Sequence, residues 1–339
     1  MKDKGTISRR DFLAGASGLA LAAMAPGARA QQIEEVTLRL NATGYGEHAP
    51  FAVGIDKGFF TEERIALVLK EGQGSGRTVQ VIGSKSDPFG YADTATSMKA
   101  IAAGVPIRTV AVFQQVSPVA LIFLADKGYK TPADMLNATI ALTAGDSIHQ
   151  MIPAFFKKNG LDPAKAKLLF MDVAAKSTAV AVGKADSMGG FYTTQAAQIA
   201  TIAKKPTGWL RFSDFGVNTL TQGIIVHRDI LKEKPDLVRR FLRAAVKSWS
   251  YAAQNPDEAV RSLLKAFPSS SFLQIPEQGL RQWNHHRELM YTPRTKGMSP
   301  GRVDVADAQD TIDLLADYGG LAPKGRVEDY LTNEFLPAR

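Results

Sequence analysis

The chain has 339 residues, of which 45% are hydrophobic and 22% charged, and it contains no cysteine. This length favours about two domains, and the composition is that of a globular protein. The missing cysteine excludes a disulfide framework, a thiolate metal site and a cysteine nucleophile. The net charge of +8 leaves open an anionic partner such as nucleic acid.

The first 30 residues have the pattern of an export signal. Four basic residues precede an uncharged run over 12–25, and the small-residue sequence Ala28-Arg29-Ala30 follows. A membrane anchor is the alternative, but the run is short of the roughly 20 residues that span a bilayer. Residues 8–13 (SRRDFL) resemble the twin-arginine export motif. We therefore predict a periplasmic protein with its signal peptide, residues 1–30, cleaved near Ala30.

Removal of this segment changes the meaning of the charge. The segment holds five basic and two acidic residues, so the mature chain would carry +5. Its other basic residues occur singly or as doublets such as Lys204-Lys205. Nucleic-acid binding needs a clustered basic face or a motif, so no nucleic-acid partner is expected. Without a cysteine to be lipidated, the mature protein should diffuse freely.

Short β-rich runs alternate with helical patterns after the signal. Strands are expected at 36–40, 65–69, 89–92 and 107–113, with helices between them. An apolar strand at 119–124 leads into a second series, with strands at 139–142, 167–171 and 187–191. A further strand at 223–226 is followed by helices to the end, one with an apolar stripe that includes Trp249. This alternation predicts α/β architecture with mostly parallel sheets.

The sequence offers no catalytic or metal-binding constellation. The five histidines lack the paired spacing of the helical zinc motif and are interpreted as surface side chains. Residues 145–149 lack the last glycine of a nucleophile elbow, and Arg77 breaks the dinucleotide fingerprint after the glycine-rich loop 72–76. We expect no catalytic residue, metal or cofactor; an extracytoplasmic enzyme is the alternative of another class.

Three loops at the carboxyl ends of predicted strands are candidate ligand sites, because ligands of open α/β sheets bind there. Two of them open helices whose free N–H groups can hold polar or anionic groups. For Asp93 and Ser147 simple helix capping is an equally good interpretation. The candidate residues are Asn41, Tyr45, His48, Asp93, Thr94, Gly145, Asp146 and Ser147.

A fourth candidate is the run Gly189-Gly190-Phe191-Tyr192, followed by Gln195. The two glycines let another surface approach closely, and the aromatic rings stand at a strand end. Core packing is the alternative for an isolated phenylalanine. The position of the run favours a wall of a ligand site.

The chain resembles the Thi5/NMT1-like group of solute-binding proteins of ABC transporters. The resemblance runs from about residue 36 to the end, and it rests on the order and spacing of short segments. These are HAP at 48–50, KGFF at 57–60, FGYAD at 89–93, GVP at 104–106, Ser117-Pro118, GLD at 160–162, GGFY at 189–192, PDLVRRFL at 235–242 and TNEFLP at 332–337.

The resemblance implies a two-lobed periplasmic binding protein of type II, with ligand held in the cleft between the lobes. Lobe 1 would comprise 33–124 plus 226–339 and lobe 2 would comprise 126–222, with hinge strands near 124 and 223. Ser117 joins the expected ligand-binding residues. The protein would be a monomer that binds a small molecule by hinge closure and delivers it to an ABC permease in the inner membrane.

Two departures from the group bear on chemistry. Fungal members are enzymes that use a lysine-bound pyridoxal phosphate and a histidine, but the matching positions here are Ala92 and Thr96. In pyrimidine binders an acid follows the aromatic strand end, whereas this chain has Gln195. We expect a small heterocyclic or aromatic ligand, similar to a pyrimidine or thiamine precursor. A sulfonate, taurine or nitrate binder is the alternative.

Overall fold

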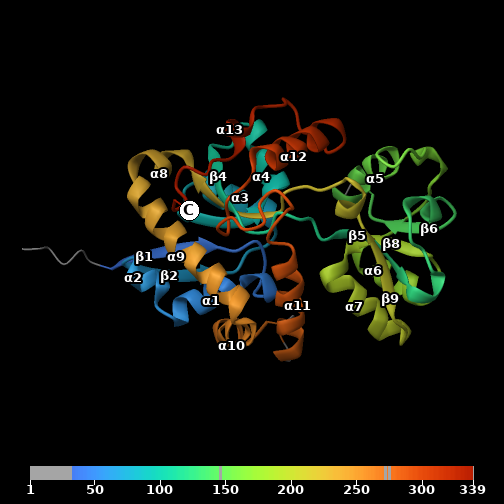
Figure 1. The fold of residues 1–339 in the computed structure, drawn as a ribbon, viewed down its shortest axis with the longest axis horizontal. Helices are drawn as coiled ribbons and strands as arrows, with labels where there is room; N and C mark the ends of the chain where they lie inside the picture. The colour runs from blue at the N-terminus through green and yellow to red at the C-terminus, as the bar shows by residue number, and fades with distance from the viewer. Residues whose placement is uncertain (1–32, 145–146, 271–272, 274–275, 339) are drawn as a thin grey trace, which may run out of the picture.

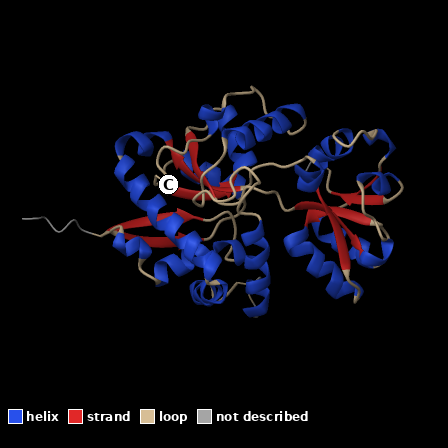
Figure 2. Ribbon diagram, viewed as in Figure 1, coloured by secondary structure: helices blue, strands red, loops and turns tan. Residues whose placement is uncertain are grey.

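The protein folds into two α/β lobes (Figure 1). The computed structural model describes residues 33–144, 147–270, 273 and 276–338. Each lobe has one five-stranded sheet with helices against its faces (Figure 2). The predicted export signal lies outside the described residues. Among the described helices, none is both long and apolar enough to cross a membrane.

The sheet of lobe 1 has the strand order β2-β1-β3-β10-β4. β1 pairs in parallel with β2 and β3, whereas β10 runs antiparallel to both of its neighbours. Four strands therefore run one way and one runs against them, as the alternating pattern predicts. The strands are β1 (Glu34–Arg39), β2 (Ile65–Lys70), β3 (Phe89–Asp93), β4 (Ile107–Val112) and β10 (Gln222–His227).

The sheet of lobe 2 repeats this plan in the order β7-β6-β8-β5-β9. β6 pairs in parallel with β7 and β8, and β5 is the reversed strand between β8 and β9. The strands are β5 (Val119–Leu124), β6 (Thr139–Leu142), β7 (Lys167–Phe170), β8 (Ser187–Phe191) and β9 (Thr207–Arg211).

The chain passes between the lobes earlier than the sequence indicates. β5 belongs to the second sheet, where Ala120 pairs with Gly190, so lobe 1 does not extend to 124. Gly223 already pairs within the first sheet. The two connections are therefore residues 113–118 and 216–221, since residues 212–215 still pack on α5 of lobe 2. The connections bond to each other where Thr221 N–H donates to Gln114 O at 3.0 Å. An apolar run predicts a strand, but only its partners decide which sheet it joins.

Helices cover both sheets, and most of them belong to lobe 1. Those of lobe 2 are α5 (Ser147–Lys157), α6 (Val173–Ala181) and α7 (Tyr192–Ala203). The others are α1 (Ala49–Asp56), α2 (Phe59–Glu62), α3 (Ser75–Gly83), α4 (Thr94–Ala102), α8 (Arg228–Glu233), α9 (Pro235–Gln254), α10 (Pro256–Ala266), α11 (Pro276–Glu288), α12 (Val305–Asp317) and α13 (Val327–Tyr330). Short 3-10 turns are η1 (Gly46–His48), η2 (Ala125–Lys127), η3 (Pro132–Leu136), η4 (Pro163–Lys165) and η5 (Phe212–Phe215).

The predicted apolar stripe of α9 forms the core of lobe 1. Trp249 is fully buried and stacks on Phe113, with ring centroids 4.6 Å apart. Eight residues earlier on the same helix, Phe241 stacks on Phe89 of β3, with ring centroids 4.0 Å apart. These contacts anchor the helix to the sheet, at the start of β3 through Phe89 and just after the end of β4 through Phe113.

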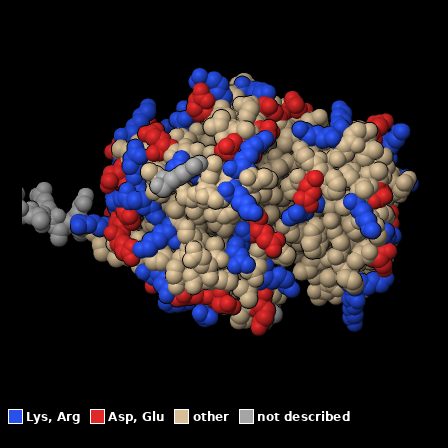
Figure 3. Space-filling view, in the orientation of Figure 1, with Lys and Arg blue, Asp and Glu red and all other residues tan. Residues whose placement is uncertain are grey.

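Charged residues of both signs are interspersed over the face of the molecule seen in Figure 3. The exposed side of α9 illustrates this mixing, since Arg243 bonds Glu63 and Lys247 bonds Glu62. Neighbouring charges of opposite sign cancel at short range, so a positive net charge need not produce a basic patch.

Candidate functional site

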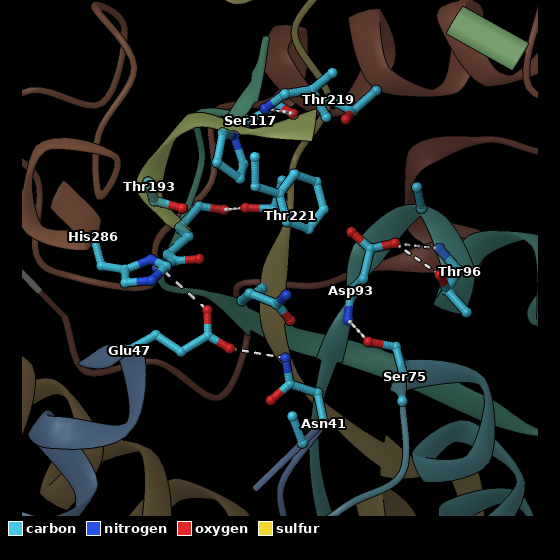
Figure 4. Close-up of a pocket in the computed structure, with 18 of the residues that line it drawn as sticks. Asn41, Glu47, Ser75, Asp93, Thr96, Ser117, Thr193, Thr219, Thr221 and His286 are labelled. Carbon is cyan, nitrogen blue, oxygen red and sulfur yellow. Dashed lines mark hydrogen bonds and ion pairs between the residues drawn. The ribbon is translucent and has the colours of Figure 1, made fainter. Parts of the chain in front are cut away.

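A cleft of about 460 Å³ lies between the lobes, and both of them contribute to its surface (Figure 4). The lobe 1 wall comprises Asn41, Tyr45, Glu47, Asp93, Gln282 and His286. The lobe 2 wall comprises Val119, Gln150, Met151, Phe191, Thr193 and Thr194. Further lining residues are Ala42, Gly74, Ser75, Ala95, Thr96, Lys99, Gln114, Ser117, Pro118, Thr219, Thr221, Gln222 and Leu315.

Strand topology explains why these residues meet. Asn41 follows β1, Asp93 ends β3 and Phe191 ends β8, so each stands at the carboxyl end of a strand. The reversed strands β5 and β10 start at the same edges, which adds Val119 and Gln222. The carboxyl edges of the two sheets face each other across the cleft, the usual place for a ligand in α/β folds.

Glu47 is the central buried group of the lobe 1 wall. It lies on the 3-10 turn η1 and is only 1% exposed. Its Oε1 accepts hydrogen bonds from Asn41 Nδ2 at 2.8 Å and from the Tyr45 hydroxyl at 2.5 Å. Burial raises the pKa of Glu47 to about 7, and the nearby Asp93 carboxyl acts in the same direction against these two hydrogen bonds.

Two buried histidines flank Glu47 without neutralising it. His286 of α11 places Nδ1 3.8 Å from Glu47 Oε2, and the same nitrogen bonds the Gln114 side chain. His48 Nε2 lies 2.8 Å from Asn41 Oδ1. Burial lowers the pKa of both imidazoles to about 3, so both are neutral near pH 7.

Asp93 forms the other acidic part of this wall. Its Oδ1 accepts from Thr96 N at 2.7 Å and from the Thr96 hydroxyl at 2.8 Å, which caps α4. Burial raises the pKa of this carboxyl as well. Lys99 is the one basic Lys or Arg side chain among the described lining residues, and its ammonium group bonds Gly319 O at 3.1 Å.

The lobe 2 wall is more apolar and more open. Phe191 is 44% exposed, and Val119 and Met151 line the cleft with it. Leu315 of α12 and Pro118 extend this apolar surface. An exposed aromatic ring at the mouth of a cleft offers a flat face to a ring-shaped ligand.

Five of the predicted ligand residues line the cleft: Asn41, Tyr45, Asp93, Ser117 and Phe191. Gly145 and Asp146 lie outside the described residues. Ser147 begins α5, but its side chain is not among those described.

Four predicted residues lie behind the cleft surface. His48 is fully buried and supports Asn41, and the buried Thr94 hydroxyl donates to Thr221 O at 2.5 Å. Tyr192 turns away from Phe191 and stacks on Trp209, with ring centroids 5.3 Å apart. Gln195 caps the start of α7, its Oε1 accepting from Phe191 N at 2.5 Å. These side chains already have partners within the protein.

The glycines before Phe191 have a packing role. A Cβ atom on Gly189 would lie 2.5 Å from Leu142 and 2.8 Å from Ile148, both in the core of lobe 2. The surface that approaches Gly189 closely is therefore the protein's own β6 and α5, whereas a Cβ atom on Gly190 would meet the side chains of Gln195 and Met188.

Residues absent from the sequence prediction include Glu47, Gln114 and His286. Glu47 stands between the predicted Tyr45 and His48, so its charge in that loop was an available signal. His286 was expected on the surface, but it is only 3% exposed, and His48 and His227 are buried as well. Nothing in the helical pattern of α11 indicates that it meets a loop more than 200 residues earlier in the chain.

The family follows from comparison with known proteins. A family model described as NMT1/THI5 like matches residues 46–259. The chain belongs to the NMT1/THI5-like family. The two-lobed fold with its interlobe cleft is that of the periplasmic binding proteins.

Its curated relatives carry three kinds of name. It is 23% identical to the riboflavin-binding protein RibY of Chloroflexus aurantiacus over 93% of this chain and 90% of the relative. It is 22% identical to a formylaminopyrimidine-binding protein of Halalkalibacterium halodurans, over 73% and 75%. It is also 25% identical to a 4-amino-5-hydroxymethyl-2-methylpyrimidine phosphate synthase of Legionella pneumophila, over 69% and 74%.

Solved structures show the same architecture. The periplasmic aliphatic sulphonate binding protein SsuA of Escherichia coli superposes with a TM-score of 0.65 at 14% identity. The match covers 88% of this chain and 97% of the other. At this identity the likeness establishes the fold, and the predicted two-lobed architecture is confirmed.

Proposed function

We propose that this protein is the periplasmic solute-binding component of an ABC importer and that it captures a small nitrogen heterocycle in the interlobe cleft. The relatives named as binders of riboflavin and of formylaminopyrimidine support this ligand class, since both ligands contain a pyrimidine ring. Hinge motion at 113–118 and 216–221 would close the lobes over the ligand. The protein would then deliver it, as a monomer, to a permease.

The charge of the cleft carries the proposal. Glu47 and Asp93 are both acidic, whereas the described lining offers Lys99 as its basic side chain, and both nearby histidines are neutral. A sulfonate or nitrate would face two carboxyl groups and could pair with only one ammonium group of the described lining. A neutral or cationic ligand with N–H groups finds acceptors instead.

The lobe 2 wall supports the same ligand class. Phe191 can stack on a flat ring, with Val119 and Met151 beside it. An aromatic contact of this kind contributes roughly 0.5–1.5 kcal/mol beyond the area that it buries. An inorganic anion would gain nothing from this apolar surface.

We propose binding without turnover, although one relative is named as a synthase. The position that holds the catalytic lysine in the fungal enzymes of the resemblance is Ala92, which is fully buried in β3. Lys176 is buried too, with Nζ donating to Gly189 O at 3.1 Å, and it is not among the residues that line the cleft. Lys99 is the one amine among the described lining residues, and its ammonium group bonds Gly319 O at 3.1 Å.

The experiment is native mass spectrometry of the protein purified from its host, followed by calorimetry. The probes are 4-amino-5-hydroxymethyl-2-methylpyrimidine, riboflavin, ethanesulfonate and nitrate. We expect a heterocycle to copurify or bind, and the two anions not to bind. Binding of the anions alone would overturn the proposal in favour of the sulfonate or nitrate class. Consumption of a bound heterocycle would show an enzyme.

A further inference from the structure

The two oxygens of Glu47 have different surroundings. Oε1 accepts both hydrogen bonds, from Asn41 and from Tyr45. Oε2 receives no hydrogen bond from the residues that the structure describes, and its nearest recorded contact is His286 Nδ1 at 3.8 Å (Figure 4). A carboxyl group buried to 99% thus keeps one acceptor oxygen unused at the surface of the cleft.

The surroundings hold this oxygen in place. Asn41 donates to Glu47 through Nδ2, while its Oδ1 is bound to His48 Nε2, so the amide cannot turn without losing both bonds. Glu47 itself lies on η1, whose Gly46 N–H donates to Gln282 Oε1 of α11 at 2.8 Å. The acceptor is therefore preorganised before a ligand arrives, which reduces the ordering required on binding.

Burying a carboxyl group with an unused acceptor is unfavourable for the folded protein, since a desolvated polar group without a partner destabilises it. The groups facing Glu47 do not relieve this. Tyr45 and Asn41 act on the other oxygen, His48 and His286 are neutral, and Asp93 is acidic. Such a group is expected where a ligand completes the bonding.

We propose that Glu47 is the specificity-determining residue of the cleft and that its Oε2 accepts a hydrogen bond from a ring N–H or an exocyclic amino group of the ligand. Asp93, seen on the other side of Asn41 in Figure 4, accepts a second donor. The ligand class is thereby narrowed to heterocycles with a donor-bearing edge, and this inference rests on the proposed function. Heterocycles with an acceptor-only edge are rejected, because two acceptors would then face each other.

Glu47→Gln tests the proposal because it changes one atom. The new amide would keep its oxygen toward Asn41 and Tyr45, which both donate, and would place an NH₂ group where Oε2 stands. An acceptor thus becomes a donor at constant shape. Glu62→Gln is the matched control, since Glu62 is exposed on α2 and pairs with Lys247 away from the cleft.

Each donor-bearing probe is paired with an analogue that lacks the donor. The pairs are 4-amino-5-hydroxymethyl-2-methylpyrimidine with 5-hydroxymethyl-2,4-dimethylpyrimidine, and riboflavin with 3-methylriboflavin. For the pair that binds, wild type and Glu62→Gln should prefer the donor-bearing member at least tenfold. Glu47→Gln should bind the donor-bearing member 10- to 100-fold more weakly than wild type does. This is the loss of affinity expected for a hydrogen bond to a charged group. The methylated member should keep its affinity within about twofold, which shows an intact cleft.

The outcomes separate the two proposals. If wild type binds a heterocycle without preferring the donor-bearing member, or if Glu47→Gln leaves that preference unchanged, the inference about Glu47 is wrong and the proposed function stands. If wild type binds only ethanesulfonate or nitrate, the proposed function fails and the inference falls with it. Thermal unfolding shows whether each variant folds. If Glu47→Gln does not fold, Glu47→Asp replaces it: this variant keeps a carboxylate acceptor and should retain part of the preference for the donor-bearing member.

Discussion

The two walls of the cleft differ in burial and polarity. On the lobe 1 wall, Asn41, Glu47 and His286 are at most 5% exposed and are joined by hydrogen bonds or close polar contacts. On the lobe 2 wall, Phe191 is 44% exposed beside other apolar side chains. One wall thus has fixed polar groups that determine which edge of a ligand is accepted. The lobe 2 wall offers an aromatic face that can stack on many different flat ligands.

The largest expected effect concerns the stability of the lobe 1 wall. The pKa of Glu47 is raised from 4.5 to about 7, so the folded protein holds a proton that the unfolded chain releases between these values. Stability contributed by this group therefore falls as pH rises from 4.5 to 7. Above pH 7 the free energy of unfolding of Glu47→Gln should exceed that of wild type by about 3 kcal/mol. The two free energies should converge near pH 4.5. Urea unfolding from pH 4.5 to 8 measures both curves, and a pH-independent difference would contradict the assignment.

Ligand affinity should depend on the same titration in the opposite direction, rising with pH where the stability falls. The acceptor is fully charged only above its pKa, so the affinity for a donor-bearing probe should fall as pH drops below 7. The fall approaches tenfold per pH unit and ends near the pKa that Glu47 has in the complex. Calorimetry of wild type and Glu47→Gln between pH 5.5 and 8 separates this effect from titration of the probe. A wild-type curve parallel to that of the variant would refute the role of the carboxylate.

The lobe 2 wall should show a smaller effect on affinity and little on stability. Phe191→Ala removes a half-exposed ring, and we expect the affinity for a heterocycle to weaken about 2- to 10-fold. The unfolding free energy should change little, since this ring is not part of the lobe 2 core. Phe170→Ala is the control, because Phe170 is 49% exposed on β7 and does not line the cleft. Unchanged affinity in Phe191→Ala, measured by calorimetry, would remove the stacking contact from the proposal.

The smallest effect is expected at Lys99. Its ammonium group bonds Gly319 O, and a heterocycle held by Glu47 and Phe191 does not need its charge. Lys99→Met should therefore leave the affinity for the heterocycle within about twofold. An anionic ligand would depend on this side chain and would lose tenfold or more, since hydrogen bonds to charged groups are among the strong ones. Titration of the variant with the copurified ligand distinguishes the two classes.

The strand-end argument located much of the site without a structure. Asn41 and Asp93 follow predicted strands and Phe191 ends one, and all three line the cleft. The argument fails at the next level of detail, because adjacent residues can point to opposite sides of a wall. Phe191 lines the cleft while Tyr192 stacks inside lobe 2 on Trp209. In the first loop, likewise, His48 supports the wall from behind while Glu47 reaches its surface.

Alternation of β-rich and helical runs determined the α/β class, and the ordered family segments determined the two-lobed fold. Local chemistry encodes these features, since periodicity and turn residues act over a few positions. The tertiary structure alone decided that β5 joins the second sheet and that His286 approaches Glu47 from α11. It also decided that one carboxyl oxygen of the buried Glu47 receives no hydrogen bond from the described part of the chain. Such facts depend on packing between segments far apart in the chain, which no local pattern records.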